Sequence, residues 1–294
     1  MKKLLGLLRL TRPANIVTAV SDILAGVAIA AALAPSGFTY DHIWLLIFST
    51  IGLYGGGVVL NDVFDADLDA IERPERPIPS GLIAQKEAAV LGLFLLAGGV
   101  SAAMIASVYP SGVIAFMIAV AAITYDKWSK HIAVIGPLNM GLCRGLNLLL
   151  GMSVAGESIL RYSFIGIVPI VYIAAITMIS QGEVHGGKSR TMLAALVLYL
   201  LVVGSILYAA YTQHTLLLTS VFVSAFLLMI IPPLWKAMNE PVGKNIGRAV
   251  RAGVIGLILM NASWAAALGS MYSALVILIL LPVSLILARL FAVT

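Results

Sequence analysis

The sequence IWLLIFSTIGLYGGGVVLN, residues 43–61, runs directly into DVFDADLD, residues 62–69. The first part is uncharged and long enough to cross a bilayer, which takes about 20 mostly apolar residues. The second part places carboxylates where that span would meet the aqueous phase, and acidic side chains at membrane depth are costly and usually functional. We therefore predict a membrane-spanning helix that ends in an acidic cluster.

The whole chain shares the apolar character of this stretch. Of its 294 residues, 61% are hydrophobic and 11% are charged, whereas soluble domains carry about 25% charged residues. The mean hydropathy is +1.05, which excludes a soluble globular enzyme and a disordered protein. No nucleic-acid partner is expected, because the 18 Lys and Arg residues are dispersed along the chain. The single cysteine, Cys143, excludes an internal disulfide.

Nine further segments have the composition of membrane spans. Segment 110–124 is short, and segments 250–269 and 272–291 form either a tight hairpin or one broken element, so nine or ten spans are expected. Lipid cannot satisfy free backbone groups, so the spans must be helices. We predict an all-α, polytopic transmembrane helical bundle that fills residues 1–294 as a single integral-membrane domain. The candidate spans are 14–34, 43–61, 87–108, 110–124, 134–155, 162–181, 191–211, 215–235, 250–269 and 272–291.

The positive charges predict the orientation, because cytoplasmic loops collect Lys and Arg. With the N-terminus inside and ten alternating spans, all but two of the 18 Lys and Arg residues fall on the cytoplasmic side. The exceptions are Arg161, on the other side, and Arg144, within a span. We predict an integral protein of the cell (inner) membrane with a cytoplasmic N-terminus, in which residues 1–12 form an interfacial helix on the membrane surface.

The spacing of the acidic cluster predicts a metal site. A helix advances about 100° per residue, which places Asn61, Asp62, Asp65 and Asp69 within an arc of roughly 100° and turns Asp67 away. Converging carboxylates repel one another without a cation, and oxygen ligands favour Mg²⁺, which often bridges carboxylates to a substrate phosphate. These four residues are therefore the predicted metal ligands. The alternative is a solvated acidic loop, although acidic residues are unfavourable at a helix C-terminus.

The segment ERPERPIPSG, residues 72–81, follows the cluster. Its three prolines end the helix and stiffen the loop. Arg73 and Arg76 stand beside the carboxylates, where they would contact a diphosphate. The alternative is that both are ordinary positive-inside anchors.

These patterns resemble those of a known family. The run N-D-x-x-D-x-x-x-D, followed by R-P-x-R-P-I-P-S-G, resembles the first aspartate-rich motif of the UbiA superfamily of intramembrane prenyltransferases. Three shorter patterns agree, and the resemblance as a whole covers residue 12 to about residue 270. They are Arg12-Pro13-x-Asn15, the segment YDKWSK at 125–130, which is similar to Y-S/T-x-x-x-K, and Arg144-x-x-Asn147-x-x-x-Gly151.

The resemblance implies a UbiA-type fold, usually with nine spans. It also implies Mg²⁺-dependent transfer of a prenyl group, within the membrane, from a polyprenyl or terpenyl diphosphate to an acceptor that the sequence does not identify. Asp62, Asp65 and Asp69 would be catalytic. The implied substrate-binding residues are Asn15, Asn61, Arg73, Arg76, Lys127, Lys130, Arg144 and Asn147. Asn15 and Asn147 have interhelical hydrogen bonds as an alternative role. Lys127 and Lys130 have positive-inside anchoring as an alternative role.

One motif of the family is altered in this chain. After the sixth span, where the family has D-x-x-x-D followed by G-K, this sequence reads SQGEVHGGKSR at 180–190. Glu183 stands where the last aspartate is expected, and Ile179, four residues earlier, cannot bind a cation. We predict that Glu183 is a catalytic carboxylate and metal ligand of a weaker second site, with His185 and Lys188 as substrate ligands. Ordinary interfacial polarity is an alternative for His185.

The first aspartate of this motif is replaced by Ile179, and its loss favours a divergent, EboC-like branch of the superfamily. It also supports an alternative function, a catalytically impaired UbiA-fold binding or transport protein for isoprenoid lipids. A CDP-alcohol phosphotransferase is disfavoured, because its D-G-x-x-A-R run does not occur in this chain.

Overall fold

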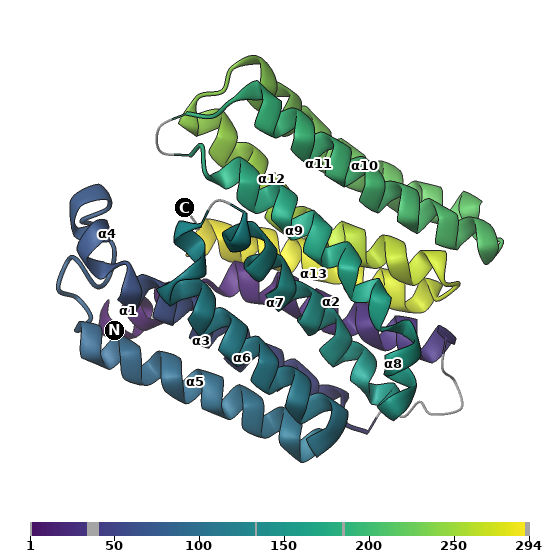
Figure 1. Cartoon of the computed structure of the whole chain (residues 1–294), viewed down its shortest axis with the longest axis horizontal. Helices are drawn as coiled ribbons and strands as arrows, with labels where there is room; N and C mark the ends of the chain where they lie inside the picture. The colour runs from purple at the N-terminus through teal and green to yellow at the C-terminus, as the bar shows by residue number, and fades with distance from the viewer. Residues whose placement is uncertain (1, 34–40, 133, 184–185, 292–294) are drawn as a thin grey trace.

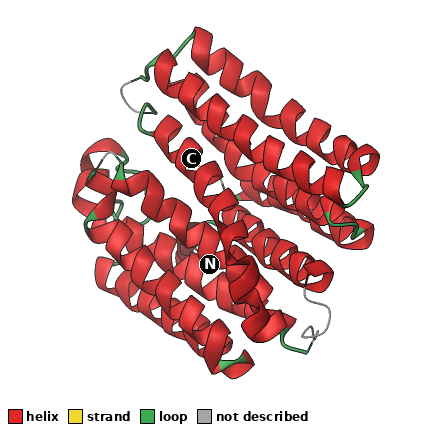
Figure 2. Ribbon diagram, turned by 45° about the vertical axis from the view of Figure 1, so that its right-hand side comes forward, coloured by secondary structure: helices red, strands yellow, loops and turns green. Residues whose placement is uncertain are grey.

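The computed structural model describes residues 2–33, 41–132, 134–183 and 186–291. Within these ranges the chain is helical and contains no strand, as Figure 2 shows. The predicted all-α class is therefore confirmed for the described part of the chain.

The helices follow one another with short connections. In chain order they are α1 (Lys2–Leu10), α2 (Pro13–Leu33), α3 (Ile43–Phe64), α4 (Ala66–Glu72), α5 (Gln85–Ala106), η2 (Val108–Gly112), α6 (Val113–Lys127), η3 (Ser129–His131), α7 (Ile135–Met152), η4 (Ser153–Ser158), α8 (Ile159–Tyr162), η5 (Ser163–Gly166), α9 (Ile167–Ser180), α10 (Ser189–Thr212), α11 (Leu216–Asn239), α12 (Gly243–Ala267) and α13 (Met271–Leu290).

Ten helical units in the described residues are long and apolar enough to cross a membrane. The segment that looked short in the sequence belongs to a 20-residue span, Val108–Lys127, because η2 continues into α6. The last two units are separate helices packed against each other, so the pair is a hairpin and not one broken element. The ten spans are Pro13–Leu33, Ile43–Phe64, Gln85–Ala106, Val108–Lys127, Ile135–Gly156, Ile159–Ser180, Ser189–Thr212, Leu216–Asn239, Gly243–Ala267 and Met271–Leu290.

Helix α12 joins two hydrophobic cores. One core is built mainly by α2, α3, α6 and α7, and the other by α9, α10 and α11. Helix α12 contributes Ile258 and Ala262 to the first core and Leu257 and Met260 to the second. Figure 1 shows α10 and α11 along one edge of the molecule and α5 along the opposite edge. The bundle therefore has two halves that share a mostly buried central helix.

Glycines let α2 and α7 approach each other closely. A Cβ atom on Gly26 would lie 2.3 Å from the carbonyl oxygen of Leu148, and one on Gly151 would lie 2.3 Å from that of Ile23. Any side chain larger than hydrogen would push the two backbones apart, and small residues have this role in many membrane helix pairs. This contact fixes α7, which carries two of the predicted site residues, against α2.

The N-terminal helix α1 packs under the end of the bundle. Leu10 is buried in a small core with Val59 of α3 and Ile83, whereas Leu4 and Leu5 are exposed. An exposed apolar face beside basic residues is the pattern of a helix that lies on a membrane surface. The predicted helix is confirmed, and its interfacial position stays a prediction.

Candidate functional site

The acidic cluster lies at a break between two helices. Helix α3 ends one residue before Asp65, which has φ −92° and ψ 3°, and α4 begins one residue after it. The assumption that Asn61, Asp62, Asp65 and Asp69 share one continuous helix is therefore wrong. Asp is a poor helix former because its carboxylate competes for backbone hydrogen bonds. Asp62 and Asp69 are nevertheless both buried, while Asp67 is exposed, as its spacing predicted.

Two arginines neutralise the buried pair of carboxylates. Arg76 Nη1 lies 2.7 Å from Asp69 Oδ2 and 3.4 Å from Asp62 Oδ1. Arg12 Nη2, from the start of the first span, lies 2.7 Å from the same Asp62 oxygen. The proline-rich loop can return to the cluster because its Ile78 is buried against α1 and α3. Cationic side chains and carboxylate oxygens thus meet at one end of the bundle.

The end of α6 adds a second set of contacts. Lys130 Nζ lies 2.5 Å from Asp65 Oδ1. Asn61 Nδ2 donates a hydrogen bond of 2.9 Å to Asp126 Oδ1. Lys130 belongs to η3, which directly follows α6. The structure thus places two further predicted site residues, Arg76 and Lys130, in contact with the cluster.

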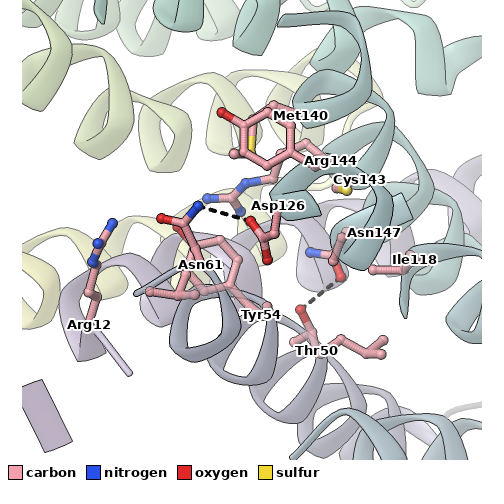
Figure 3. A pocket seen from close by; sticks show the side chains of 15 residues that line it. Arg12, Thr50, Tyr54, Asn61, Ile118, Asp126, Met140, Cys143, Arg144 and Asn147 are labelled. Atoms are coloured by element: carbon pink, nitrogen blue, oxygen red, sulfur yellow. Dashed lines mark hydrogen bonds between the residues drawn. The ribbon is translucent and has the colours of Figure 1, made fainter. Parts of the chain in front are cut away.

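A cavity of ≈ 250 Å³ lies beside the cluster (Figure 3). Arg12 and side chains of α3, α6 and α7 form its wall, which carries both polar and apolar residues. Asn61 belongs to the cluster and lines the cavity together with its hydrogen-bond partner Asp126, so the cluster and the cavity adjoin. The lining residues are Arg12, Thr50, Leu53, Tyr54, Gly57, Val58, Asn61, Ile118, Ala122, Tyr125, Asp126, Met140, Cys143, Arg144 and Asn147.

Arg144 has the partner that its position within a span requires. Its Nη1 lies 2.6 Å from Asp22 Oδ2, and Asp22 is 0% exposed. Asn147 Nδ2 donates to the same carboxylate oxygen at 3.0 Å, and Thr50 donates to Asn147 at 2.7 Å. The guanidinium also stacks on Tyr54, 4.9 Å from the ring centroid. Asn147 therefore forms hydrogen bonds between helices, which is one of the two roles predicted for it.

Glu183 lies at the same end of the bundle, where α9 meets α12. Its Oε1 lies 3.7 Å from the place that a Cβ atom on Gly247 of α12 would occupy. Burial raises the pKa of Glu183, and the positive charges of Arg73, Arg12 and Arg251 oppose that rise. Because these arginines repel a free cation, Glu183 would hold one only together with an anionic phosphate. Between Ile159 and Asn239, Glu183 is the only acidic residue of the sequence.

Other predicted residues lie away from the cavity. Lys127 is exposed, with its Nζ 4.6 Å from the ring centroid of Trp128, and Lys188 is exposed at the start of α10. Asn15 is half-buried and is not among the lining residues. His185 lies outside the described residues, so its predicted role stays a prediction.

The donor set of the cluster fits a hard cation. As they stand, no three Asp, Glu, His or Cys side chains of the described residues are close enough to hold a metal ion. In each of Asp62, Asp65 and Asp69, however, the ion pairs engage only one of the two carboxylate oxygens. Arg76 reaches two of these carboxylates, so one positive centre already lies between them. Such oxygens suit Mg²⁺ once the Arg and Lys side chains turn to phosphate.

Sequence reasoning missed three residues of the site. Arg12 and Asp126 belong to the quoted patterns, but neither was selected as a ligand. Tyr54 was not considered. The signal for Arg12 was a basic residue at the entrance of the first span, and for Asp126 an acidic residue within a span. Their contacts with Asp62 and Asn61 depend on the packing of α2 and α6 on α3.

Comparisons with known proteins show what this chain is similar to. The sequence model of the UbiA prenyltransferase family matches residues 23–240. A digeranylgeranylglyceryl phosphate synthase of Methanothrix thermoacetophila is 34% identical over 155 residues, which is 52% of this chain and 55% of the relative. The chain thus spans about half the length of the curated relatives that it matches.

Two solved structures share the fold. A UbiA homologue from Aeropyrum pernix K1 has a TM-score of 0.66 and 18% identity, covering 83% of this chain and 96% of the homologue. A UbiA homologue from Archaeoglobus fulgidus bound to GPP and Mg²⁺ has a TM-score of 0.57 and 14% identity, covering 91% of this chain and 99% of that one. At these identities the likeness establishes the fold alone.

Proposed function

The chain belongs to the UbiA prenyltransferase family, and from that premise we propose that it transfers a prenyl group from a prenyl diphosphate to an acceptor within the membrane, with Mg²⁺ as cofactor. The observation that carries the proposal is the acidic, arginine-rich cluster at the mouth of an intramembrane cavity. A diphosphate needs cations and a prenyl chain needs an apolar environment, and the two are adjacent here. The Archaeoglobus homologue, bound to GPP and Mg²⁺, supports this choice of donor and ion.

The residues of the cluster would have distinct tasks. Asp62, Asp65 and Asp69, with the amide oxygen of Asn61, would hold Mg²⁺. The ion, when bound, would offset the negative charge of the diphosphate leaving group.

Arg76, Lys130 and Arg12 now neutralise these carboxylates, and they would turn to phosphate oxygens as the ion takes their place. Positive groups fixed beside the leaving group favour breakage of the bond between C1 and the diphosphate oxygen.

The second site would be weaker. Glu183 supplies a single carboxylate. Among the nearby positive charges, that of Arg73 lowers the pKa of Glu183 most, so Arg73 would contact the same diphosphate. Lys188 and His185 would act from the loop between α9 and α10, as would Lys127 from the end of α6. Asn15 would contribute from the start of α2.

The protein is an integral membrane protein with ten candidate spans in its described residues. We propose that it is one domain of the cell membrane with a cytoplasmic N-terminus, because that orientation gathers the basic residues on the cytoplasmic side. The site then faces the cytosol, where a soluble diphosphate headgroup has access to it.

The test is an Asp65→Ala variant, assayed in membranes with pooled prenyl diphosphates, Mg²⁺ and a membrane lipid extract. Transfer is expected to fall about 100-fold, the scale of losing one group that stabilises developing charge. Asp67→Ala, a matched change at an exposed aspartate, should transfer at the wild-type rate. A wild-type rate in Asp65→Ala contradicts the proposal.

A second function is favoured by one observation, the single carboxylate at the α9–α12 site. In that case the chain is a binding or transport protein for isoprenoid lipids that has lost catalysis. Binding of geranyl diphosphate and Mg²⁺ by the wild-type protein, without turnover in any extract, would support this alternative.

A further inference from the structure

A groove lies on the outside of the bundle between α1 and the first turns of α5, away from the cavity described above. Its volume is ≈ 560 Å³. Figure 1 shows α1 beside the start of α5, and an ion pair joins the two helices there, with Lys3 Nζ 2.7 Å from Glu87 Oε1. Two helices therefore build this groove, and both contribute charged side chains to it.

The charged end of the groove carries a surplus of positive charge. Lys3 and Lys86 line it together with Glu87. Both oxygens of Glu87 are already engaged, Oε1 by Lys3 and Oε2 by the backbone N–H of Ala84 at 3.3 Å. Lys86 has no ion-pair or hydrogen-bond partner among the described residues, and the ammonium of Lys3 has further hydrogens to donate. One net positive charge and several donors therefore remain for a ligand.

The rest of the groove is apolar. Val90 and Phe94 follow Lys86 at intervals of four residues, so the three side chains form one row along α5 that is about 12 Å long. Val90 and Phe94 are exposed. Leu7 and Leu91 also line the groove, and both pack against the small core under α1. The row thus runs from a cation to an aromatic ring over an apolar surface.

The position of this row in the bilayer follows from the span to which it belongs. Lys86 is the second residue of the span Gln85–Ala106, so it lies at the level of the lipid headgroups, whereas Phe94 lies at the depth of the acyl chains. Basic pockets at the ends of membrane helices bind the headgroups of anionic lipids. The charge and the apolar row are therefore arranged in the order in which a phospholipid presents its phosphate and its acyl chains.

We propose that the groove between α1 and α5 binds one anionic phospholipid, with its phosphate on Lys3 and Lys86 and an acyl chain along Val90 and Phe94. The single negative charge of such a lipid matches the one net positive charge of the groove. A free phosphate ion would leave the apolar row uncovered, and a lipid without net charge would leave the surplus cation without a counter-charge.

The lipid would contact both helices and so hold α1 against the bundle. Arg12 follows the last residue of α1 by two positions and contacts Asp62. The same lipid would therefore stabilise the segment that positions this arginine.

The experiment measures lipid binding and needs no turnover. Dioleoyl phosphatidylglycerol and dioleoyl phosphatidylcholine, which share their acyl chains, are each titrated into the purified full chain in detergent, and bound lipids are counted by native mass spectrometry. Salt at about 0.15 M screens charges farther than about 8 Å apart, so only close contacts contribute strongly. We expect one phosphatidylglycerol to bind at least fivefold more tightly than phosphatidylcholine.

The decisive variant is Lys86→Gln, which should reduce this preference to less than twofold. Lys244→Gln is the matched control, because Lys244 is also exposed and is also the second residue of a span, Gly243–Ala267. It should keep the wild-type preference. Lys3→Gln repeats the test from α1 and should weaken phosphatidylglycerol as Lys86→Gln does, so the result does not depend on the folding of one variant.

Four results would overturn the inference. Equal binding of the two lipids would remove the selection for charge, and equal losses in Lys86→Gln and Lys244→Gln would show a general attraction to basic span ends. Competition by glycerophosphoglycerol, the headgroup without acyl chains, at the same concentration as the lipid would indicate a site for free phosphate. Displacement by equimolar geranyl diphosphate would assign the groove to the prenyl donor. None of these measurements depends on prenyl transfer, so the proposed function and this inference can fail separately.

Discussion

At the scale of single residues, the buried ion pair between Arg144 and Asp22 supports the cavity wall. The carboxylate also accepts hydrogen bonds from Asn147 and from Asn261 of α12. A buried pair with such satisfied geometry is costly to break, because the remaining charge has no partner. The pair therefore holds the guanidinium against Tyr54, at the edge of the cavity.

Removing the carboxylate should destabilise the fold strongly. We expect Asp22→Ala to lower the free energy of unfolding in detergent by about 3–5 kcal/mol, the usual cost of leaving one buried charge unpaired. Removing both charges, in Asp22→Ala with Arg144→Met, should recover part of that loss. Asp41→Ala, at an exposed aspartate, is the matched control. A loss no larger than that of the control would contradict this account.

The need for a partner of Arg144 could be predicted from the sequence, but the identity of the partner could not. A charge within an apolar span requires compensation wherever it lies. Asp22 is 122 positions away along the chain, and nothing in local spacing brings the two together. The same holds for Arg12 with Asp62, because that contact depends on how α2 enters the bundle.

At the scale of helices, the contact between α2 and α7 decides the position of Arg144 and Asn147. Gly151→Ala should separate the two helices, since its Cβ would lie 2.3 Å from the backbone oxygen of Ile23. Overpacking of this kind costs about 1–3 kcal/mol. Gly204→Ala on α10 is the control, because its Cβ meets nothing within 4 Å.

The measurement is denaturant unfolding in detergent, together with the affinity for geranyl diphosphate. Both should decrease for the α7 variant, whereas the α10 variant should match wild type or gain stability slightly. Equal behaviour of the two alanine variants would show that the helices can adjust without cost.

The lengths of the apolar segments predicted the spans well, whereas the prediction of one continuous helix through the acidic cluster was wrong. An angular projection treats every residue as helical, so it cannot detect the break at Asp65. Two features compensate for the break. Arg76 reaches both Asp62 and Asp69 across it, and Lys130 contacts the carboxylate at the break itself. The grouping of the carboxylates therefore depends on tertiary contacts and not on a shared helix face.

At the scale of the whole molecule, the orientation in the membrane can be tested with cysteines. In a Cys143→Ser background, Ser80→Cys lies in the proline-rich loop and Gln213→Cys in the loop between α10 and α11, and both positions are exposed. A cytoplasmic N-terminus places these loops on opposite sides of the membrane. A membrane-impermeant thiol reagent should label the Gln213 variant in intact cells and the Ser80 variant after lysis. The reverse pattern would contradict the orientation.

The cavity belongs to one part of the bundle. Its described lining consists of Arg12 and residues of α3, α6 and α7, while α9, α10 and α11 pack into a separate core. Exchanging α10 and α11, residues 189–239, with those of another family member should therefore alter stability before it alters which compounds are accepted. Directed evolution toward new products can concentrate its libraries on the 15 lining positions and leave α10 and α11 unchanged.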